Sequence, residues 1–300
     1  MSRTRGCAST PLLELGQDAF FKLEFLHIGR SHKARAAVGM LDRAEAAGDL
    51  IRNTGQIILE KTGGNLGVSL AIEGRRRGYE VHLVVDLAFS QRKKDLLTQL
   101  GAELVGIERL KQGETNRGVV EALLKESARE GKHYVFLDQF ADAGSVRGHL
   151  TTLVPETAEQ LRELTITPET HIDLVLGAGT GASASALKQG LVSAGYGVSL
   201  HVVQPEGCSF TDGRFPQHSI QGTAVGDGPR LLDLKEVESY IDVSSIEAER
   251  GRQVLLNNFG LLCGISSGAN YAAVSKYCHV RNSRKRRVVL SLLYDRGEDY

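Results

Sequence analysis

The chain has 300 residues, about twice the commonest domain size, and its 36 basic and 36 acidic side chains give a formal net charge of zero. This balance excludes the broad basic surface that gathers nucleic acid or anionic membranes, so we expect neither as a partner. Four cysteines without paired short spacings, no export signal and no run of eighteen apolar residues predict a reduced cytoplasmic protein without a membrane span, disulfide framework or metal site.

Short apolar runs alternate with amphipathic stretches of helix length along most of the chain. In the first half, the predicted elements are a helix headed by Ser31–Arg35, strand 57–59, helix 66–77, strand 81–85, helix 90–100, strand 103–107, helix 116–130 and strand 134–137. In the second half, they are helix 155–164, strand 172–176, a helix ending near residue 194, strand 199–203, helices 246–259 and 267–278, and strand 288–292. Such alternation favours parallel sheets, and a second sheet starts in the second half.

Two segments lack these patterns. The loop 205–230 is too long for a plain connection, and we expect it to lie over an active site. The basic run 281–287 is expected to be a solvated loop before the last strand.

The glycine-rich turn Gly177–Gly181 lies between an apolar strand and a helix, where backbone N–H groups and the helix dipole attract a phosphate. The spacing Gly177-x-Gly179-x-x-Ala182 also matches the dinucleotide fingerprint, with Glu206 as an acidic residue beyond the next strand. A nicotinamide-dependent oxidoreductase and a purely structural turn are therefore alternatives. Pro205 and Gly207 argue against the first, because they interrupt the strand end where a ribose-binding acid belongs.

Three further segments carry groups that suit an anionic or carbonyl ligand. The segment 60–67 (Glu-Lys-Thr-Gly-Gly-Asn-Leu-Gly) offers turn amides and Asn65, although a helix cap would also explain it. A lysine such as Lys33 is usually a surface charge, but burial makes the amine neutral enough to attack an aldehyde. The segment 264–270 (Gly-Ile-Ser-Ser-Gly-Ala-Asn) places hydroxyls before a helix, where capping is the alternative.

Together and in this order, the four segments resemble the cysteine synthase (O-acetylserine sulfhydrylase) and cystathionine β-synthase family, the fold-type II enzymes that use pyridoxal 5′-phosphate (PLP). Further matching motifs are Thr10-Pro11-Leu12 with Lys22-Leu23-Glu24, Gly101-Ala102-Glu103, Gln139-Phe140 with His149, Ile220-Gln221-Gly222 and the closing segment 294–300. The resemblance implies a tryptophan-synthase-β-like α/β fold with two mostly parallel twisted sheets flanked by helices. It also implies a homodimer, with a smaller mobile domain at 40–144 and a larger domain built from 1–39 and 145–300.

The family pattern gives each matching residue a role. Lys33 becomes the Schiff-base lysine that also moves the substrate α-proton, Asn65 binds the 3′-oxygen of PLP, and Ser266 meets the pyridine nitrogen. The phosphate cup consists of Gly179, Thr180, Gly181, Ala182 and Ser183. The substrate carboxylate faces Thr62, Gly63, Gly64 and Gln139. A neutral hydroxyl does not hold a proton on the pyridine nitrogen as a carboxylate would, which favours β-elimination followed by addition of a small nucleophile.

The departures from the family pattern concern the substrate more than the cofactor. The family usually has Ser in place of Gly63 and Thr in place of Leu66, so two hydroxyls expected near the substrate carboxylate are missing. The resemblance implies an O-activated serine or a cysteine-like amino acid as substrate and cysteine as product, and the departures favour a non-proteinogenic amino acid, such as a 2,3-diaminopropionate precursor, as an alternative product. A catalytically silent member of the family that acts as a binding partner remains an alternative.

Overall fold

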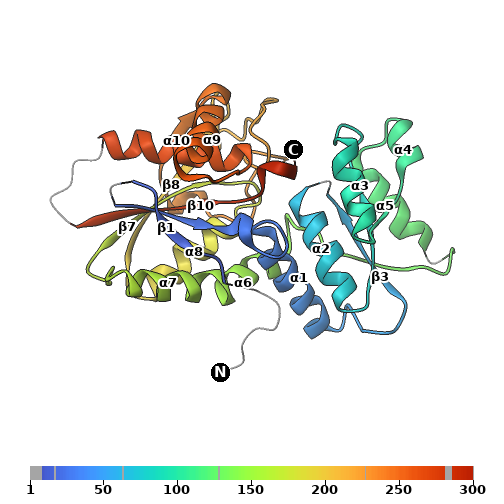
Figure 1. The fold of residues 1–300 in the computed structure, drawn as a ribbon. Coiled ribbons are helices and arrows are strands. Elements are labelled where there is room, and N and C mark those ends of the chain that lie inside the picture. The colour runs from blue at the N-terminus through green and yellow to red at the C-terminus, as the bar shows by residue number, and fades with distance from the viewer. Residues whose placement is uncertain are drawn as a thin grey trace. The chain divides into compact units, whose positions relative to one another are not determined.

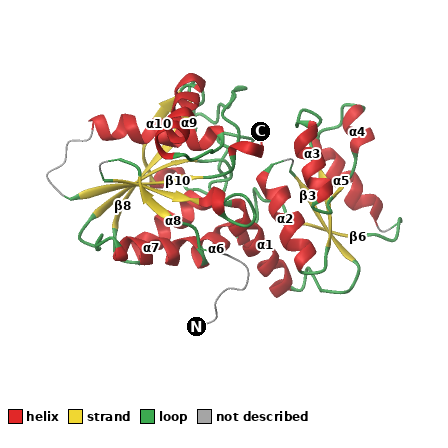
Figure 2. Cartoon of the chain, viewed as in Figure 1, coloured by secondary structure: helices red, strands yellow, loops and turns green. Residues whose placement is uncertain are grey.

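The computed structural model describes residues 9–16, 18–62, 64–127, 129–226, 228–280 and 286–299. The chain forms two compact units, one from Ile28–Gly148 and the other from the described parts of Ala8–His27 and His149–Glu298. Within the described residues, each unit holds one mostly parallel sheet with helices on both faces (Figures 1 and 2). The predicted α/β class with two sheets is therefore confirmed. The same residues include no helix long and apolar enough to cross a membrane.

The first unit is built around a parallel sheet with the strand order β5-β4-β3-β6. Its elements are α1 (Lys33–Ala47), β3 (Gln56–Lys61), α2 (Asn65–Arg76), β4 (Glu80–Val84), α3 (Gln91–Gln99), β5 (Glu103–Leu104), α4 (Ile107–Lys111), α5 (Asn116–Ser127), β6 (His133–Phe136) and the start of α6 (Gly144–Thr151). In β3, Ile58 belongs to a core shared with α1, α2 and α3, whereas Leu59 belongs to a core shared with α4 and α5. Both faces are covered, which explains the continuous apolar run of this strand.

Helix α1, which begins with Lys33, approaches the first turn of α6 at glycines. A Cβ atom on Gly39 would collide with the backbone of Gly144 and Gly148, and a Cβ on Gly148 would collide with the carbonyl group of Arg35. Only glycine permits two helix backbones to come this close.

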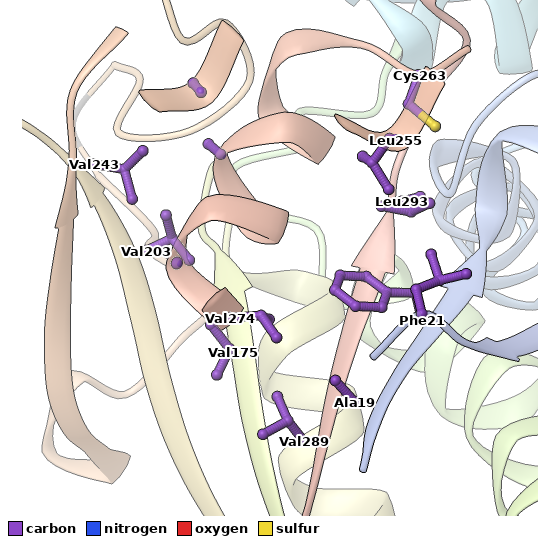
Figure 3. Close-up of a cluster of buried hydrophobic side chains, with 14 of the residues drawn as sticks. Ala19, Phe21, Val175, Val203, Val243, Leu255, Cys263, Val274, Val289 and Leu293 are labelled. Carbon is purple, nitrogen blue, oxygen red and sulfur yellow. The ribbon is translucent and has the colours of Figure 1, made fainter. Parts of the chain in front are cut away.

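The second unit is built around a sheet with the order β1-β2-β10-β7-β8-β9, in which β1 and β2 are antiparallel and the other pairs parallel. Its elements are β1 (Leu12–Glu14), β2 (Ala19–Leu23), η1 (Glu24–Leu26), α7 (Leu153–Glu163), β7 (His171–Gly177), α8 (Ala182–Ser193), β8 (Gly197–Pro205), η2 (Leu234–Glu236), β9 (Val237–Val243), α9 (Ser245–Phe259), α10 (Ile265–Val280), β10 (Arg287–Leu293) and η3 (Gly297–Asp299). Helices α9 and α10 cover one face and α7 and α8 the other (Figure 1). Figure 3 shows the core on the first of these faces, where Phe21, Val175 and Val289 lie beneath Leu255 and Val274.

Several sequence predictions were wrong in detail. The strand expected over 103–107 ends at Leu104, because Gly106 adopts φ 74° and is the cap residue before α4, a helix that was not predicted. The helix expected over 116–130 ends at Ser127. Strands β1, β2 and β9 were also missed. In the basic run, Arg287 begins strand β10, whereas residues 281–285 lie outside the described residues.

The bounds of the compact units differ from the expected domain bounds. Residues 28–39 and 145–148 belong to the first unit, whereas the sequence predicted that they belong to the larger domain. Helix α1 packs with α2 through Ala37, Met40 and Leu41, which explains why its first turns stay with this unit. The expected movement of a smaller domain at 40–144 stays a prediction.

Candidate active site

Lys33 stands at the first position of α1, and its amine is held inside the first unit. Its Nζ donates a hydrogen bond to Oε1 of Gln139 at 3.3 Å, and its backbone N–H donates to the hydroxyl of Ser31 at 3.3 Å. Burial disfavours the ammonium form and lowers the pKa of Lys33 to about 8, against the opposing effect of the nearby Glu60 carboxylate. An amine with this pKa is neutral in an appreciable fraction of molecules near pH 7 and can act as a nucleophile.

Glu60 is a buried acid near this lysine that the sequence reasoning did not select. It lies at the end of β3 with no exposed surface, and its Oε1 accepts a hydrogen bond from the backbone N–H of Lys61 at 3.1 Å. Burial and the charge of Asp138 raise the pKa of Glu60 to about 8, although Lys61 and the backbone N–H of Gln139 favour the ionised form. The only sequence signal was the position of a carboxylate at the end of an apolar strand.

The loop after β3 contains the residues predicted to bind the substrate carboxylate and the cofactor oxygen. The hydroxyl of Thr62 accepts a hydrogen bond from the backbone N–H of Gly64 at 3.3 Å, and Asn65 begins α2. A Cβ atom on Gly64 would meet nothing within 4 Å, so a ligand can approach the backbone there. Gly63 lies outside the described residues. Leu66 is buried in the core of the first unit.

In the second unit, the predicted phosphate cup forms the junction between β7 and α8. Gly181 adopts φ 88° just before Ala182 opens the helix, so the first-turn N–H groups of α8 are presented at this end. A Cβ atom on Gly179 would collide with the carbonyl oxygen of Gly222. The side chains of Thr180 and Ser183 are buried at the same turn. The junction therefore has the backbone shape and donors that a phosphate needs.

The loop 205–230, as far as it is described, packs onto this turn through its last third. The carbonyl oxygen of Ala178 accepts hydrogen bonds from the hydroxyl of Thr223 at 3.2 Å and the backbone N–H of Ala224 at 2.9 Å. The backbone N–H of Leu231, just beyond the loop, donates to the carbonyl of Thr180 at 3.0 Å. The loop and the residue after it thus bond the carbonyl groups of Ala178 and Thr180 in the turn.

Two buried side chains that the sequence reasoning left out of the site support Gly177, where β7 ends. Oδ1 of Asn270 accepts a hydrogen bond from the backbone N–H of Gly177 at 2.9 Å, and the hydroxyl of Tyr294 donates to the Gly177 carbonyl at 2.9 Å. The Asn270 amide also donates to the carbonyl of Leu292 at 2.9 Å. Both residues belong to motifs quoted from the sequence, but the sequence does not show which backbone groups their side chains bind, because those groups come from distant segments.

Ser266 lies in the first turn of α10, one helical turn before Asn270, and is buried. Residues four apart share a face of a helix. The contact between Asn270 and Gly177 therefore brings the first turn of α10, and with it the Ser266 hydroxyl, to the same end of the sheet as the glycine turn. The group at this position is a neutral hydroxyl and not a carboxylate.

The donor set has the chemistry that PLP requires. The buried amine of Lys33, with its lowered pKa, suits the aldehyde of PLP. The N-terminus of α8, preceded by glycines whose positions leave no room for a Cβ, suits the phosphate. The buried residue Ser266 offers a hydroxyl that suits the pyridine nitrogen. The amine lies in the first unit, whereas the phosphate turn and the hydroxyl lie in the second.

Comparison with protein-family models decides the family. Residues 4–295 match the model described as pyridoxal-phosphate dependent enzyme. The chain belongs to this family. Its cofactor is PLP, and the nicotinamide alternative is set aside.

Individual members of the PLP-dependent family match nearly the whole chain. A probable cysteine synthase of Bacillus subtilis is 30% identical over 97% of this chain and 93% of its own length. A cysteine synthase of Staphylococcus aureus is 29% identical over 99% of this chain and 94% of its own length. Among solved structures, O-ureido-L-serine synthase is 26% identical, with a TM-score of 0.83 over 97% of this chain and 90% of its own. The resemblance to the cysteine synthase family is thereby confirmed.

A cavity of about 460 Å³ in the first unit of this PLP-dependent enzyme is separate from the predicted site residues. Its lining consists of Arg30, Arg92, Lys93, Asp95, Leu96 and Gln99. Lys93 lies against the ring of Phe89, with Nζ 5.6 Å from the ring centre. None of the residues with a predicted role lines this cavity.

Proposed function

We propose that the protein is a PLP-dependent β-replacement enzyme, which exchanges the substituent on Cβ of an O-activated serine or a cysteine-like amino acid for a small nucleophile. The observation that carries the proposal is the buried hydroxyl of Ser266 in the first turn of α10, the position where the family pattern meets the pyridine nitrogen. When bound, PLP withdraws electrons from the substrate Cα, and a ring nitrogen without a held proton does so less strongly. A weaker electron sink favours loss of a leaving group from Cβ.

Lys33 is the residue to which we assign the covalent bond to the cofactor and the transfer of the substrate α-proton. Its pKa of about 8 suits both tasks, because the amine must be neutral to attack an aldehyde or to accept a proton. The hydrogen bond from Nζ to Gln139 holds the free amine in place. The Lys33 amine thus keeps one orientation while it is not bonded to the cofactor.

The remaining roles follow the same family pattern. We assign the phosphate to the turn of Gly179, Thr180, Gly181, Ala182 and Ser183, where the helix dipole of α8 and the shape of the turn support it. Asn65 binds the 3′-oxygen. The substrate carboxylate is assigned to Thr62, Gly63, Gly64 and Gln139, and the open space beside Gly64 supports this assignment.

The substrate carboxylate is expected to meet fewer hydroxyls here than in the family pattern. Leu66 belongs to the apolar core and therefore offers nothing to a carboxylate. This difference supports a non-proteinogenic product, such as a 2,3-diaminopropionate precursor, beside cysteine itself. Similarity to O-ureido-L-serine synthase, whose name contains a non-proteinogenic serine derivative, points in the same direction.

We further infer a cytoplasmic homodimer in which a smaller domain at 40–144 closes on the substrate. The buried cysteines Cys208 and Cys263 are free thiols, which suits a reducing compartment. Light scattering of the purified protein tests the dimer, and a monomer at working concentration would contradict it.

A donor screen tests the proposed function. Purified protein is mixed in turn with O-acetylserine, O-phosphoserine, serine and cysteine, and the visible absorption of its cofactor is followed. Sulfide, ammonia, glutamate or a thiol is then added, and the amino-acid products are identified by mass spectrometry. Spectral change with a donor and a new β-substituted product are expected. A protein that binds PLP on Lys33 but responds to no donor would instead be the catalytically silent family member.

A further inference from the structure

Glu60 has no task in the function proposed above, yet it is coupled to the cofactor-binding lysine. Among the described residues, it supplies the neighbouring charge that acts on the pKa of Lys33. Gln139 connects the two residues, because its side chain accepts the hydrogen bond from Lys33 at 3.3 Å while its backbone N–H favours the ionised form of Glu60. A buried carboxyl group therefore lies within electrostatic reach of the amine.

The surroundings of Glu60 leave half of its carboxyl group unbonded. Oε1 accepts the backbone N–H of Lys61, whereas Oε2 is buried and has no hydrogen-bond partner among the described residues. An ionised carboxylate in such a place pays for desolvation without full compensation, whereas a protonated carboxyl does not. Burial therefore favours the protonated form of Glu60.

The charged groups that act on this pair come from three elements. Lys61 lies at the end of β3 beside Glu60, Asp138 follows β6, and the amine of Lys33 comes from α1. Lys61 and Asp138 also attract each other, with Nζ 3.9 Å from Oδ1. The strand partner of Glu60 on β4 is the apolar Leu83. Asp138 opposes the ionisation of Glu60, and Lys61 favours it.

We propose that Glu60 is a positioning residue that sets the protonation state of the Lys33 amine, an inference that rests on the proposed function. While Glu60 is ionised, its charge stabilises the ammonium form of Lys33. When a proton passes from the ammonium group to Glu60, both groups become neutral, which burial favours. The neutral Lys33 amine is the form that would condense with the cofactor aldehyde, with loss of water.

If Glu60 has this role, two substitutions should shift the pKa of Lys33 in opposite directions. Glu60→Gln keeps the shape but is permanently neutral, so it removes the charge that holds Lys33 as ammonium and lowers the pKa of Lys33. Asp138→Asn removes a charge that opposes the ionisation of Glu60, so Glu60 ionises more readily and raises the pKa of Lys33. Asn suits the second position, because Asp138 has φ 50°, a conformation that Asn tolerates. The two variants are thus expected to act in opposite directions.

The experiment measures the attachment of PLP to Lys33 as a function of pH. Apoprotein is prepared from purified holoenzyme of the wild type and both variants, and PLP uptake is followed by visible absorption between about pH 6 and 9, a range around the pKa of about 8. Borohydride trapping and mass spectrometry verify that Lys33 carries the cofactor. We expect the midpoint for Glu60→Gln to move lower, by up to about one pH unit, with the gain in attachment rate largest near pH 8, where a good part of the wild-type Glu60 is ionised. The midpoint for Asp138→Asn is expected to move higher.

A second measurement does not involve the cofactor. Reductive methylation of the apoprotein with formaldehyde and cyanoborohydride modifies neutral amines, and mass spectrometry gives the rate at Lys33 at each pH. The same opposite shifts are expected. Unchanged midpoints in both variants would overturn the role of Glu60 while leaving the proposed function intact. A wild-type protein that never attaches PLP to Lys33 would instead refute the proposed function, and the methylation profile would still report on Glu60.

Discussion

The side-chain amide of Asn270 accepts the backbone N–H of Gly177 at 2.9 Å and donates to the carbonyl of Leu292 at 2.9 Å, so one buried residue of α10 joins the ends of strands β7 and β10. The glycine turn that we assign to the phosphate starts at the same Gly177. The Asn270 side chain therefore joins these strand ends and the turn to helix α10.

Replacing Asn270 by alanine should therefore weaken both the fold and the phosphate turn. Two buried backbone groups would lose their partners, which is expected to lower the free energy of unfolding of the apoprotein by about 2–4 kcal/mol. Tyr294→Phe removes a single hydrogen bond to the Gly177 carbonyl and serves as the milder comparison, at about 1 kcal/mol. Urea unfolding and PLP titration of both variants test this. Equal losses of unfolding free energy in the two variants would show that the two hydrogen bonds of Asn270 contribute no more than the single bond of Tyr294.

Glycines of the site should differ in their tolerance of a methyl group. Gly179→Ala places a Cβ against the carbonyl oxygen of Gly222, so the turn has to move and PLP affinity is expected to fall by at least about tenfold. Gly64→Ala meets nothing within 4 Å and should leave the free energy of unfolding unchanged while weakening substrate binding. Equilibrium binding of PLP and steady-state KM values separate the two effects. Wild-type PLP affinity in Gly179→Ala would remove this turn from the cofactor site.

A carboxylate at position 266 should change the reaction, not the fold. Ser266→Asp places an acid in the first turn of α10, where the helix dipole tolerates it, and this acid would hold a proton on the pyridine nitrogen. We expect kcat/KM for β-replacement to fall by at least about tenfold, with Ser266→Ala closer to the wild type. Kinetics with the donor from the screen measure this. The reverse order of the two variants would contradict the assigned role of the hydroxyl.

Replacing Leu66 by threonine, the residue that the family usually has, should lower the stability of the protein. Because Leu66 is 1% exposed within the apolar core, Leu66→Thr exchanges packed methyl groups for a buried hydroxyl and is expected to cost about 2–3 kcal/mol of stability. Urea unfolding of the apoprotein gives the value. A Leu66→Thr variant of undiminished stability with improved substrate affinity would mean that this side chain can face the substrate after all.

Stability in acid should depend on Asp173, a buried carboxylate in β7 at the end of the sheet opposite to Gly177. Burial alone would raise its pKa, but the nearby His201 ring, with Nε2 3.6 Å from Oδ1, and the hydrogen bonds from Arg287 outweigh it and lower the pKa from 3.8 to about 2. A lowered folded-state pKa adds stability above pH 3.8 that is lost as the pH falls through about 2. Asp173→Asn should therefore cost about 2–3 kcal/mol at pH 7, and the difference should shrink between pH 4 and pH 2. Urea unfolding of both proteins across this pH range measures the difference. A loss of unfolding free energy that does not depend on pH would mean that the substitution acts through side-chain packing and not through the charge of Asp173.

The sequence was informative where one short segment determines its own geometry. Alternating apolar and amphipathic runs predicted the α/β class and the strands β3 and β7, and the glycine spacing located the turn before α8. Elements that depend on distant partners were missed: β9 is only partly buried and gains its place by pairing with β8, and β1 is a three-residue edge strand. In the site, Glu60 and Asn270 escaped notice for the same reason, since a carboxyl or an amide gains its role from groups that only the fold brings near.

Because α1 and α6 approach each other closely, a mutation at some distance from Lys33 can still abolish activity. Lys33 opens α1, and Gly39 lies six residues along, about 9 Å away along the helix axis. Because any side chain at Gly39, Gly144 or Gly148 would push these helices apart, it would also displace the amine. A saturation screen scored on turnover would thus report these glycines as intolerant positions, although they contribute no functional group.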